Sequence, residues 1–287
     1  VLSSQRQLSP LTLLLTGLII GLFCSALQNG IALFRHEQLQ SLFIWSSGNL
    51  TQNDWSVAKV LAPVLLLIVL LVLLFSRPLN LLRLSDTMVN SLGGRSQRIR
   101  LGGLLLVTLA AGWTVSQVGI IGFIGLFAPQ ICRLLPHKRF ISHLLLVMMF
   151  GALVLLACDQ LSVLSQYAGY QFTAGNITAI GGIPLMLFII AKARFITTPD
   201  LRPPVRHTVM MTGTKYVLTG LLLLLVTLLA VSITRNAHGL VLNWHDPLAF
   251  RWPRAVVAGS CGALLAIGGV ILQRLTADPL ASPEVLG

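Results

Sequence analysis

Residues 57–75, VAKVLAPVLLLIVLLVLLF, decide what kind of protein this chain is. The run holds a single charged residue, Lys59, and at about 1.5 Å per residue a helix of this length crosses a hydrocarbon layer of roughly 30 Å. Further apolar stretches lie around it, at 11–34, 101–119, 118–135, 141–160, 172–191, 216–234 and 255–272. The sequence therefore predicts an all-α polytopic membrane protein with about eight transmembrane helices.

The composition excludes a soluble protein. Hydrophobic residues make up 55% of the chain and charged residues 10%, which leaves too little polar side chain to cover a water-facing surface. The net charge of +12 would suggest a nucleic-acid partner if it lay on one soluble face. Instead, most of the 20 Lys and Arg residues fall into every second gap between the apolar stretches, as the positive-inside rule requires if the chain starts in the cytoplasm. We therefore expect no nucleic-acid partner, and a multi-pass protein with both ends of this chain cytoplasmic.

No motif for bond chemistry is present in the sequence. It contains no P-loop, no HExxH helix and no local signature of a Ser/His/Asp triad. The four cysteines lie in or at the ends of apolar stretches without CxxC spacing, so we expect buried thiols rather than disulfides or a metal site. The sequence predicts no catalytic residue, no bound cofactor and no metal. Because the chain lacks an initiator Met and a signal-peptide pattern, we expect it to be a piece of a longer protein.

The gap between 77 and 100 carries a helical pattern. Its apolar residues recur at helical spacing, Asp86 suits a helix start, and Gly93-Gly94 supplies a stop. This predicts a short amphipathic cytoplasmic helix that includes Leu84, Met88 and Leu92. Such a helix is either a membrane-surface element or a lever held by a partner protein, and the pattern leaves both open.

Polar residues inside the predicted spans are nearly all neutral. Five of them are candidates for lining a path through the membrane: Ser25, Gln28, Asn29, Thr114 and Gln117. Uncharged polar groups suit a large solute whose own charge is already masked, whereas an ion channel or proton-driven carrier normally shows more ionisable residues. Asp159, near the outer end of its span, is either a helix-end hydrogen bonder or a functional residue.

Irregular backbone is expected at two places, and a cationic cluster at a third. Glycines and a proline break 119–129, and backbone of this kind at membrane depth is buried in protein or lines a cavity. The glycine-rich stretch 167–182 suggests a turn or re-entrant segment. The predicted outer loop 235–254 ends in Arg251-Trp252-Pro253-Arg254, whose two guanidiniums either pair with carboxylates of an external protein or form an ordinary interfacial cluster.

Four segments together resemble the permease subunits of type II ABC importers for iron-siderophores, haem and vitamin B12. They are GFIGLFAP at 122–129, TAIGGIP at 178–184, RWPR at 251–254 and QRLTADPLASPEVLG at 273–287. In that family the last two motifs belong near the start of a ten-helix permease and the first two near its end, so the order here is reversed. The resemblance implies that the end of one permease half is fused to the beginning of another, as in the double-length permeases of ferric hydroxamate importers. Residues 1–194 would be helices 5–10 of the first half, 195–215 a cytoplasmic linker, and 216–287 helices 1–2 of the second half.

The resemblance also implies partners and residue roles. Leu84, Asp86, Met88, Leu92 and Gly93 would belong to the coupling helix that sits in a cleft of a cytoplasmic ATPase dimer, which holds the ATP and Mg. Arg251 and Arg254 would dock acidic residues of a periplasmic siderophore-binding protein, and the solute would be a ferric siderophore crossing the bacterial inner membrane.

The chain departs from the family's usual pattern at four points. Asp86 stands in place of Glu, Gln130 in place of His and Asp278 in place of Asn, and the Arg often found just after the Asp159 position is absent. The alternatives that stay open are another iron chelate, haem or cobalamin as solute, and, as a different class, a channel or secondary carrier that works without an ATPase.

Overall fold

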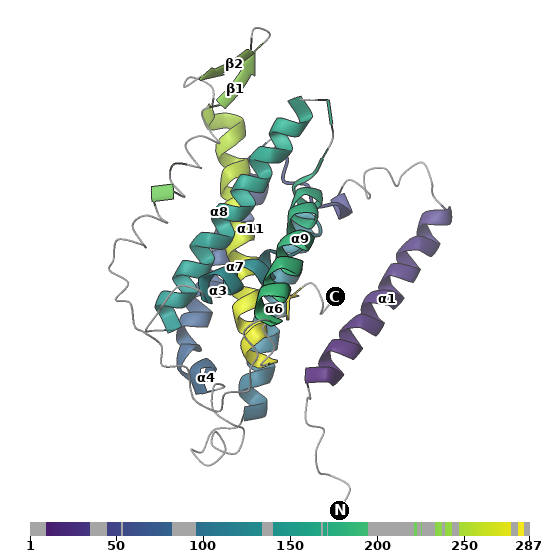
Figure 1. The fold of residues 1–287 in the computed structure, drawn as a ribbon, viewed down its shortest axis with the longest axis vertical. Coiled ribbons are helices and arrows are strands. Elements are labelled where there is room, and N and C mark those ends of the chain that lie inside the picture. Colours follow the sequence, from purple (N-terminus) through teal and green to yellow (C-terminus); the bar gives the residue numbers. More distant parts are fainter. Residues whose placement is uncertain are drawn as a thin grey trace, which may run out of the picture.

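The computed structural model describes residues 10–34, 45–52, 54–81, 96–133, 140–167, 169–170, 172–194, 221–222, 225, 233–236, 239–242, 247–276 and 281–283. Within these residues the protein is a bundle of helices with one small antiparallel hairpin (Figure 1). The elements are α1 (Pro10–Phe34), α3 (Ser56–Leu74), α4 (Ser76–Leu81), α6 (Ser96–Val118), α7 (Ile124–Arg133), α8 (Phe140–Tyr167), α9 (Ala174–Arg194), β1 (Ile233–Asn236), β2 (Gly239–Leu242) and α11 (Pro247–Leu275).

Helix α11 forms the centre of the bundle. It packs against α3, α6, α7 and α8, and every residue from 260 to 273 is buried (Figure 1). Glycine makes this close packing possible: a Cβ at Gly151 of α8 would lie 2.5 Å from the Gly262 carbonyl oxygen of α11. Small residues let helix backbones approach in this way inside a membrane. One core therefore joins the last described helix to helices from the first two thirds of the chain.

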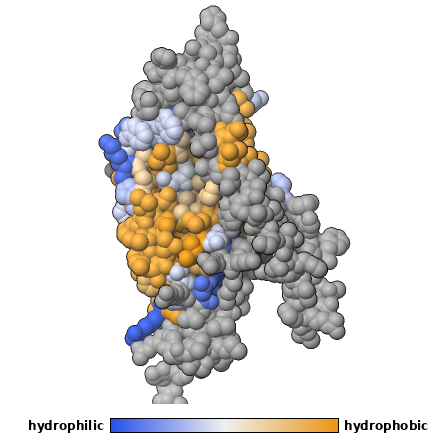
Figure 2. All heavy atoms as spheres, turned by 90° about the vertical axis from the view of Figure 1, so that its left-hand side faces the viewer, coloured by the Kyte–Doolittle hydropathy of each residue, from blue (hydrophilic) through white to orange (hydrophobic). Residues whose placement is uncertain are grey.

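The helices confirm the prediction of a polytopic membrane protein. Among the described residues, four segments are long and apolar enough to cross a membrane: 56–74, 97–118, 140–166 and 251–275. These correspond to the predicted stretches at 57–75, 101–119, 141–160 and 255–272. Figure 2 shows a broad apolar surface on one face, with hydrophilic residues toward both ends, which is the surface expected of a bundle surrounded by lipid.

Helix α1 stands to one side of the bundle (Figure 1). Most side chains between residues 15 and 31 are exposed, including Ile19 at 63%, Leu22 at 64% and Phe23 at 65%. A helix with apolar residues exposed around its circumference is stable in contact with lipid or another apolar surface, not with water. The predicted stretch 11–34 is therefore one helix of membrane character.

One predicted span turns out differently, and another is described only in part. The stretch 118–135 contains only α7, which at 10 residues is too short to cross a membrane by itself. Most of 216–234 lies outside the described residues, and its last two residues begin strand β1, which pairs Ile233 with Leu242.

The break between α6 and α7 confirms the predicted irregular backbone over residues 119–123, whereas residues 124–129 belong to α7. Gly119 has a φ of 82° and Phe123 a φ of 70°, both in the left-handed region. The Gly119 amide still caps the end of α6 by donating to Val115 O at 2.9 Å. A Cβ at Gly119 would collide with the Trp45 carbonyl oxygen, so this turn also needs glycine because another segment packs against it.

The prediction of an irregular segment over 167–182 was too long. Helix α9 begins at Ala174, so Gly175, Gly181 and Gly182 are helical, and of the described residues in this stretch only 169–170 and 172–173 lie outside a helix. The error came from applying glycine's poor helix propensity in water to a packed site. A Cβ at Gly182 would lie 2.7 Å from Phe123 Cγ, so glycine serves close packing there.

Candidate functional site

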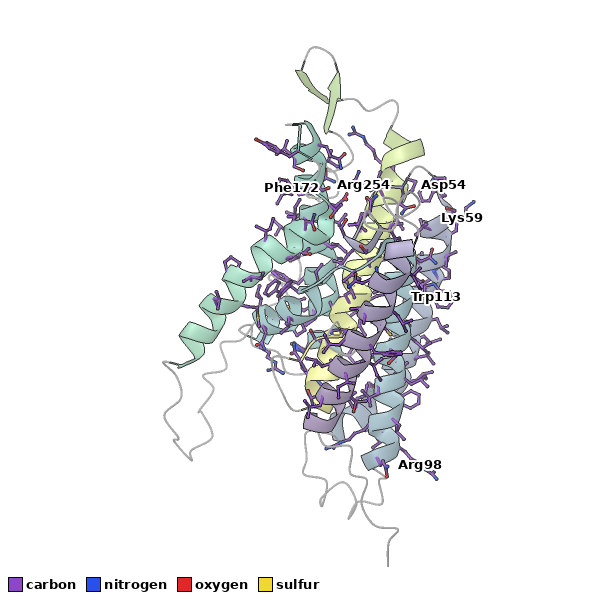
Figure 3. All side chains as sticks on the ribbon, turned by 90° about the vertical axis from the view of Figure 1, so that its right-hand side faces the viewer. Asp54, Lys59, Arg98, Trp113, Phe172 and Arg254 are labelled. Carbon is purple, nitrogen blue, oxygen red and sulfur yellow. The ribbon has the colours of Figure 1, made fainter. Side chains whose placement is uncertain are left out.

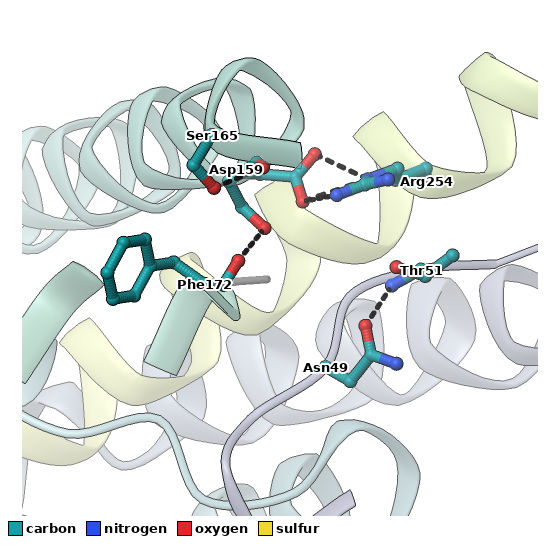
Figure 4. A network of polar contacts seen from close by, with 7 residues as sticks. Asn49, Thr51, Asp159, Ser165, Phe172 and Arg254 are labelled. Carbon is teal, nitrogen blue, oxygen red and sulfur yellow. Dashed lines mark hydrogen bonds and ion pairs between the residues drawn. The ribbon is translucent and has the colours of Figure 1, made fainter. Parts of the chain in front are cut away.

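An ion pair with three hydrogen bonds joins α8 to α11. Arg254 Nε donates to Asp159 Oδ1 at 2.9 Å and to Oδ2 at 2.8 Å, and Arg254 Nη2 donates to Oδ1 at 2.8 Å (Figure 4). The Asp159 side chain is 0% exposed and that of Arg254 is 15% exposed. Because a buried carboxylate is unfavourable without a partner of opposite charge, the two residues depend on each other.

The predicted loop carrying Arg251 and Arg254 is in fact the first part of α11. The helix starts at Pro247, which suits a first helical position because proline needs no backbone hydrogen bond there, and Pro253 lies within it. The helix fixes the two arginines three residues apart, close to one turn, so their positions are coupled. This corrects the expectation that both lie on a loop.

Backbone contacts gather near the same end of the bundle. Ser162 Oγ donates to Phe172 O at 2.6 Å, which ties α8 to the turn before α9 (Figure 4). Thr173 Oγ1 donates to Ser47 O at 2.7 Å, and Gly175 N donates to Gly48 O at 3.1 Å. The segment 45–50 therefore holds the start of α9 against the rest of the bundle. Figure 3 places Arg254, Phe172 and Asp54 toward this end, called the Arg254 end below, and Arg98 at the opposite end.

Asp54 lies just before α3. Its Oδ1 accepts hydrogen bonds from the Ser56 hydroxyl at 2.5 Å and from the Ser56 amide at 3.1 Å. These bonds, together with the nearby Lys59, lower the pKa of the Asp54 carboxyl from its ordinary value. Asp54 is therefore ionised at the start of α3, where a negative charge interacts favourably with the helix dipole.

The opposite end of α11 has a polar contact of its own. Arg274 Nη1 donates to Asn80 Oδ1 of α4 at 3.0 Å. The guanidinium carbon also lies 3.9 Å from the centre of the Phe140 ring at the start of α8, a cation–π contact. Helices α8 and α11 are thus joined through Arg274 at one end and through Arg254 near the other.

The candidate path residues do not form one cluster. Ser25, Gln28 and Asn29 are exposed on α1, which stands apart from α6 (Figure 1). Thr114 is buried on α6, where its hydroxyl donates to Ala110 O at 2.7 Å within the same helix, and Gln117 is half-buried. The path assignment therefore stays a prediction.

The predicted coupling residues lie outside the described residues. Leu84, Asp86, Met88, Leu92 and Gly93 fall between α4, which ends at Leu81, and α6, which begins at Ser96. Arg274 therefore contacts the helix that comes directly before this segment in sequence.

The Asp159–Arg254 pair is the feature that sequence reasoning missed. The sequence drew attention to both residues but gave them separate roles. The available signal was physical: a carboxylate within a membrane span needs a cation nearby, and Arg254 lies close to the start of another span.

Comparisons with known proteins agree with this architecture. The model of the FecCD transport family matches residues 1–192 and 216–287. The chain is 40% identical, over 98% of its length, to the iron(3+)-hydroxamate import system permease protein FhuB of Escherichia coli (strain K12), and covers 44% of that protein. It is also 40% identical, over 98% of its length, to the protein of the same name in Salmonella typhimurium, of which it covers 42%.

A more distant relative is the hemin transport system permease protein HmuU of Yersinia pestis, with 33% identity over 63% of this chain and 54% of that protein. The chain thus spans less than half the length of the two hydroxamate permeases. No solved structure matches it.

Proposed function

The chain belongs to the FecCD transport family, and from this premise we propose that it is part of the permease of an ATP-driven importer that carries ferric hydroxamate siderophores across the bacterial inner membrane. One observation carries the choice of solute. The chain is 40% identical to hydroxamate permeases over 98% of its length, whereas its 33% identity to the hemin permease extends over 63%.

We propose the following division of the chain. Residues 1–194 contribute helices of a first permease half, 195–215 form a cytoplasmic linker, and 216–287 begin a second half. The family match supports this proposal because its two matched parts leave out 193–215. The Arg254 end then faces the periplasm and the Arg98 end the cytoplasm, since the basic residues around Arg98 belong inside by the positive-inside rule.

The mechanism is a conformational cycle rather than bond chemistry. A loaded binding protein docks at the Arg254 end, ATP and Mg bind to a cytoplasmic ATPase dimer, and the dimer closes. The segment around Met88 transmits that motion to the membrane helices, and the solute passes by alternating access. Ser25, Gln28, Asn29, Thr114 and Gln117 line the path, because neutral polar groups accept a chelate whose iron charge is masked. This chain itself holds no cofactor in the proposed cycle.

The glycine contacts of α11 support such a cycle. A helix held by direct backbone contact to α8 moves together with it, so a displacement at one end reaches the other with little loss. The Arg274–Asn80 bond connects this unit to α4, next in sequence to the proposed coupling segment.

Uptake of radiolabelled iron tests the proposal. Cells that lack their own hydroxamate permease but keep the ATPase and binding protein should take up ferrichrome-bound iron when they produce the full-length permease. An ATPase variant that binds but does not hydrolyse ATP should abolish that uptake.

Two results would redirect the assignment. Uptake of haem or cobalamin in place of ferrichrome would assign this chain to a different solute of the same family. Uptake by proteoliposomes that contain the permease without any ATPase would favour a channel or secondary carrier instead.

A further inference from the structure

Packing of α8 on α11 does not by itself require the Asp159–Arg254 pair. The two helices already meet at Gly151 and Gly262, where their backbones are in direct contact. Apolar residues of similar volume often stabilise a helix contact as well as a buried ion pair does, because the pair must be stripped of water. A buried charged pair that joins the candidate spans 140–166 and 251–275 therefore suggests a role beyond holding the helices together.

The geometry uses only one side of the guanidinium. Asp159 accepts from Nε and Nη2 of Arg254, with bond lengths from 2.8 to 2.9 Å. A guanidinium is planar and carries five N–H groups, so its Nη1 group and the second N–H of Nη2 point away from a carboxylate bound in this way. Since the Arg254 side chain is 15% exposed while Asp159 is 0% exposed, the carboxylate lies on the inner side of the pair.

An arginine in this position can bind a second carboxylate. Its orientation is already fixed by three charge-assisted hydrogen bonds, so little side-chain freedom is lost when a partner binds. The Arg254 end also carries Arg251, three residues earlier on the same helix, so a second cation lies within about one turn of Arg254.

We propose that Asp159 is a positioning residue for docking: it holds the inner edge of the Arg254 guanidinium so that the outer edge receives a carboxylate from the periplasmic binding protein. This inference rests on the proposed function, since it specifies how the docking site is built. The partner it fits is a protein surface with an acidic side chain able to reach the first turns of α11.

The charges predict which rate constant the pair controls. Asp159 and Arg254 together are neutral, so at a distance they attract an acidic partner weakly. Their contribution comes after contact, through short hydrogen bonds, and appears in the dissociation rate. Replacing Asp159 by Asn removes a negative charge, so it should leave the association rate unchanged or raise it while it speeds dissociation.

The test measures association and dissociation rates separately. Full-length permease, assembled with its ATPase in lipid nanodiscs, is immobilised, and ferrichrome-loaded siderophore-binding protein is the probe. Asp159→Asn should raise the dissociation rate about tenfold, equivalent to about 1.4 kcal/mol. Ser165→Ala is the matched control, because it alters the same end of α8 but removes only a bond to Ser162 O within that helix. Its rates should match those of the unaltered protein.

A second variant separates positioning from stability. Exchanging the charges, Asp159→Arg together with Arg254→Asp, keeps an ion pair between α8 and α11 but removes the guanidinium from α11. The exchange should recover thermal stability relative to Arg254→Asp alone, yet still dissociate fast. Slow dissociation by the exchanged protein, or a dissociation rate for Asp159→Asn within twofold of the unaltered one, would overturn the positioning role while leaving the proposed function in place. Failure of the unaltered permease to bind the probe would overturn both.

Discussion

Replacing Gly151 by Ala should push α8 away from α11. The added Cβ would lie 2.5 Å from both the Gly262 carbonyl oxygen and the Ala266 Cβ, whereas ordinary van der Waals contact begins at 3.4 Å. One of these neighbours is backbone and the other is a short side chain in a buried helix, so neither can rotate away. The helices must separate by about 0.9 Å or more locally, and overpacking of this kind costs about 1–3 kcal/mol.

The same interface supplies a matched control. A Cβ at Gly259 of α11 would lie 4.0 Å from the Leu156 side chain of α8, which is ordinary contact. Gly259→Ala should therefore keep the packing and gain up to about 1 kcal/mol from alanine's better helix propensity. Gly151→Ala gains the same term but loses more, so we expect it to be less stable than Gly259→Ala by about 1–3 kcal/mol.

The assay is reversible unfolding in mixed detergent micelles, followed by helix content for the two variants and the unaltered protein. Gly151→Ala should unfold at the lowest denaturant concentration. It should also speed dissociation of the binding protein, because separating α8 from α11 lengthens the Asp159–Arg254 contacts. If Gly151→Ala were as stable as Gly259→Ala, the backbone contact between the two helices would be refuted.

Three further changes test other parts of the account. Arg251→Glu should slow association of the binding protein, with a smaller effect at high salt because screening weakens charge attraction; an unchanged rate at low salt would contradict docking at this residue. Leu84→Asp should leave ATP hydrolysis in place but uncouple it from uptake, and normal uptake by this variant would argue against a coupling helix. Arg274→Ala should destabilise the bundle by about 1 kcal/mol through loss of its bond to Asn80 and its contact with Phe140, which thermal unfolding would detect; no change in stability would show that this contact is dispensable.

Long apolar helices were the part of the fold that the sequence predicted best. Residues 57–75 and 255–272 each have the length and composition of a membrane span, and both lie in helices of that kind. The break at Gly119 was equally visible, because glycine and proline change local backbone preferences wherever they occur.

Sequence reasoning failed where packing overrides local preference. Gly175 and Gly182 look unfavourable for a helix in water, but in α9 they allow close approach to Ser47 and to Phe123. Arg251 and Arg254 looked like loop residues because of Pro253 and their charge, yet α11 had already begun at Pro247. In neither case does the local sequence show which residues will pack against these positions.

The Asp159–Arg254 contact is the part of the candidate site that the sequence could not predict. Those residues lie 95 positions apart, so spacing along the chain does not pair them. Because a carboxylate within a membrane span is energetically costly, a cation must lie near it. This argument reduces the number of candidate partners for Asp159 but does not identify one. The structure supplies the missing step by packing α8 on α11.

Everything proposed about docking and coupling requires that the two ends of the bundle face different compartments. Single cysteines at Met88 and at Trp252, introduced into the full-length permease after removal of its native cysteines, can be labelled in intact cells with a thiol reagent that does not cross the inner membrane. We predict labelling at 252 from the periplasmic side, and labelling at 88 only after the membrane is opened. Labelling of both positions from the same side would contradict the account.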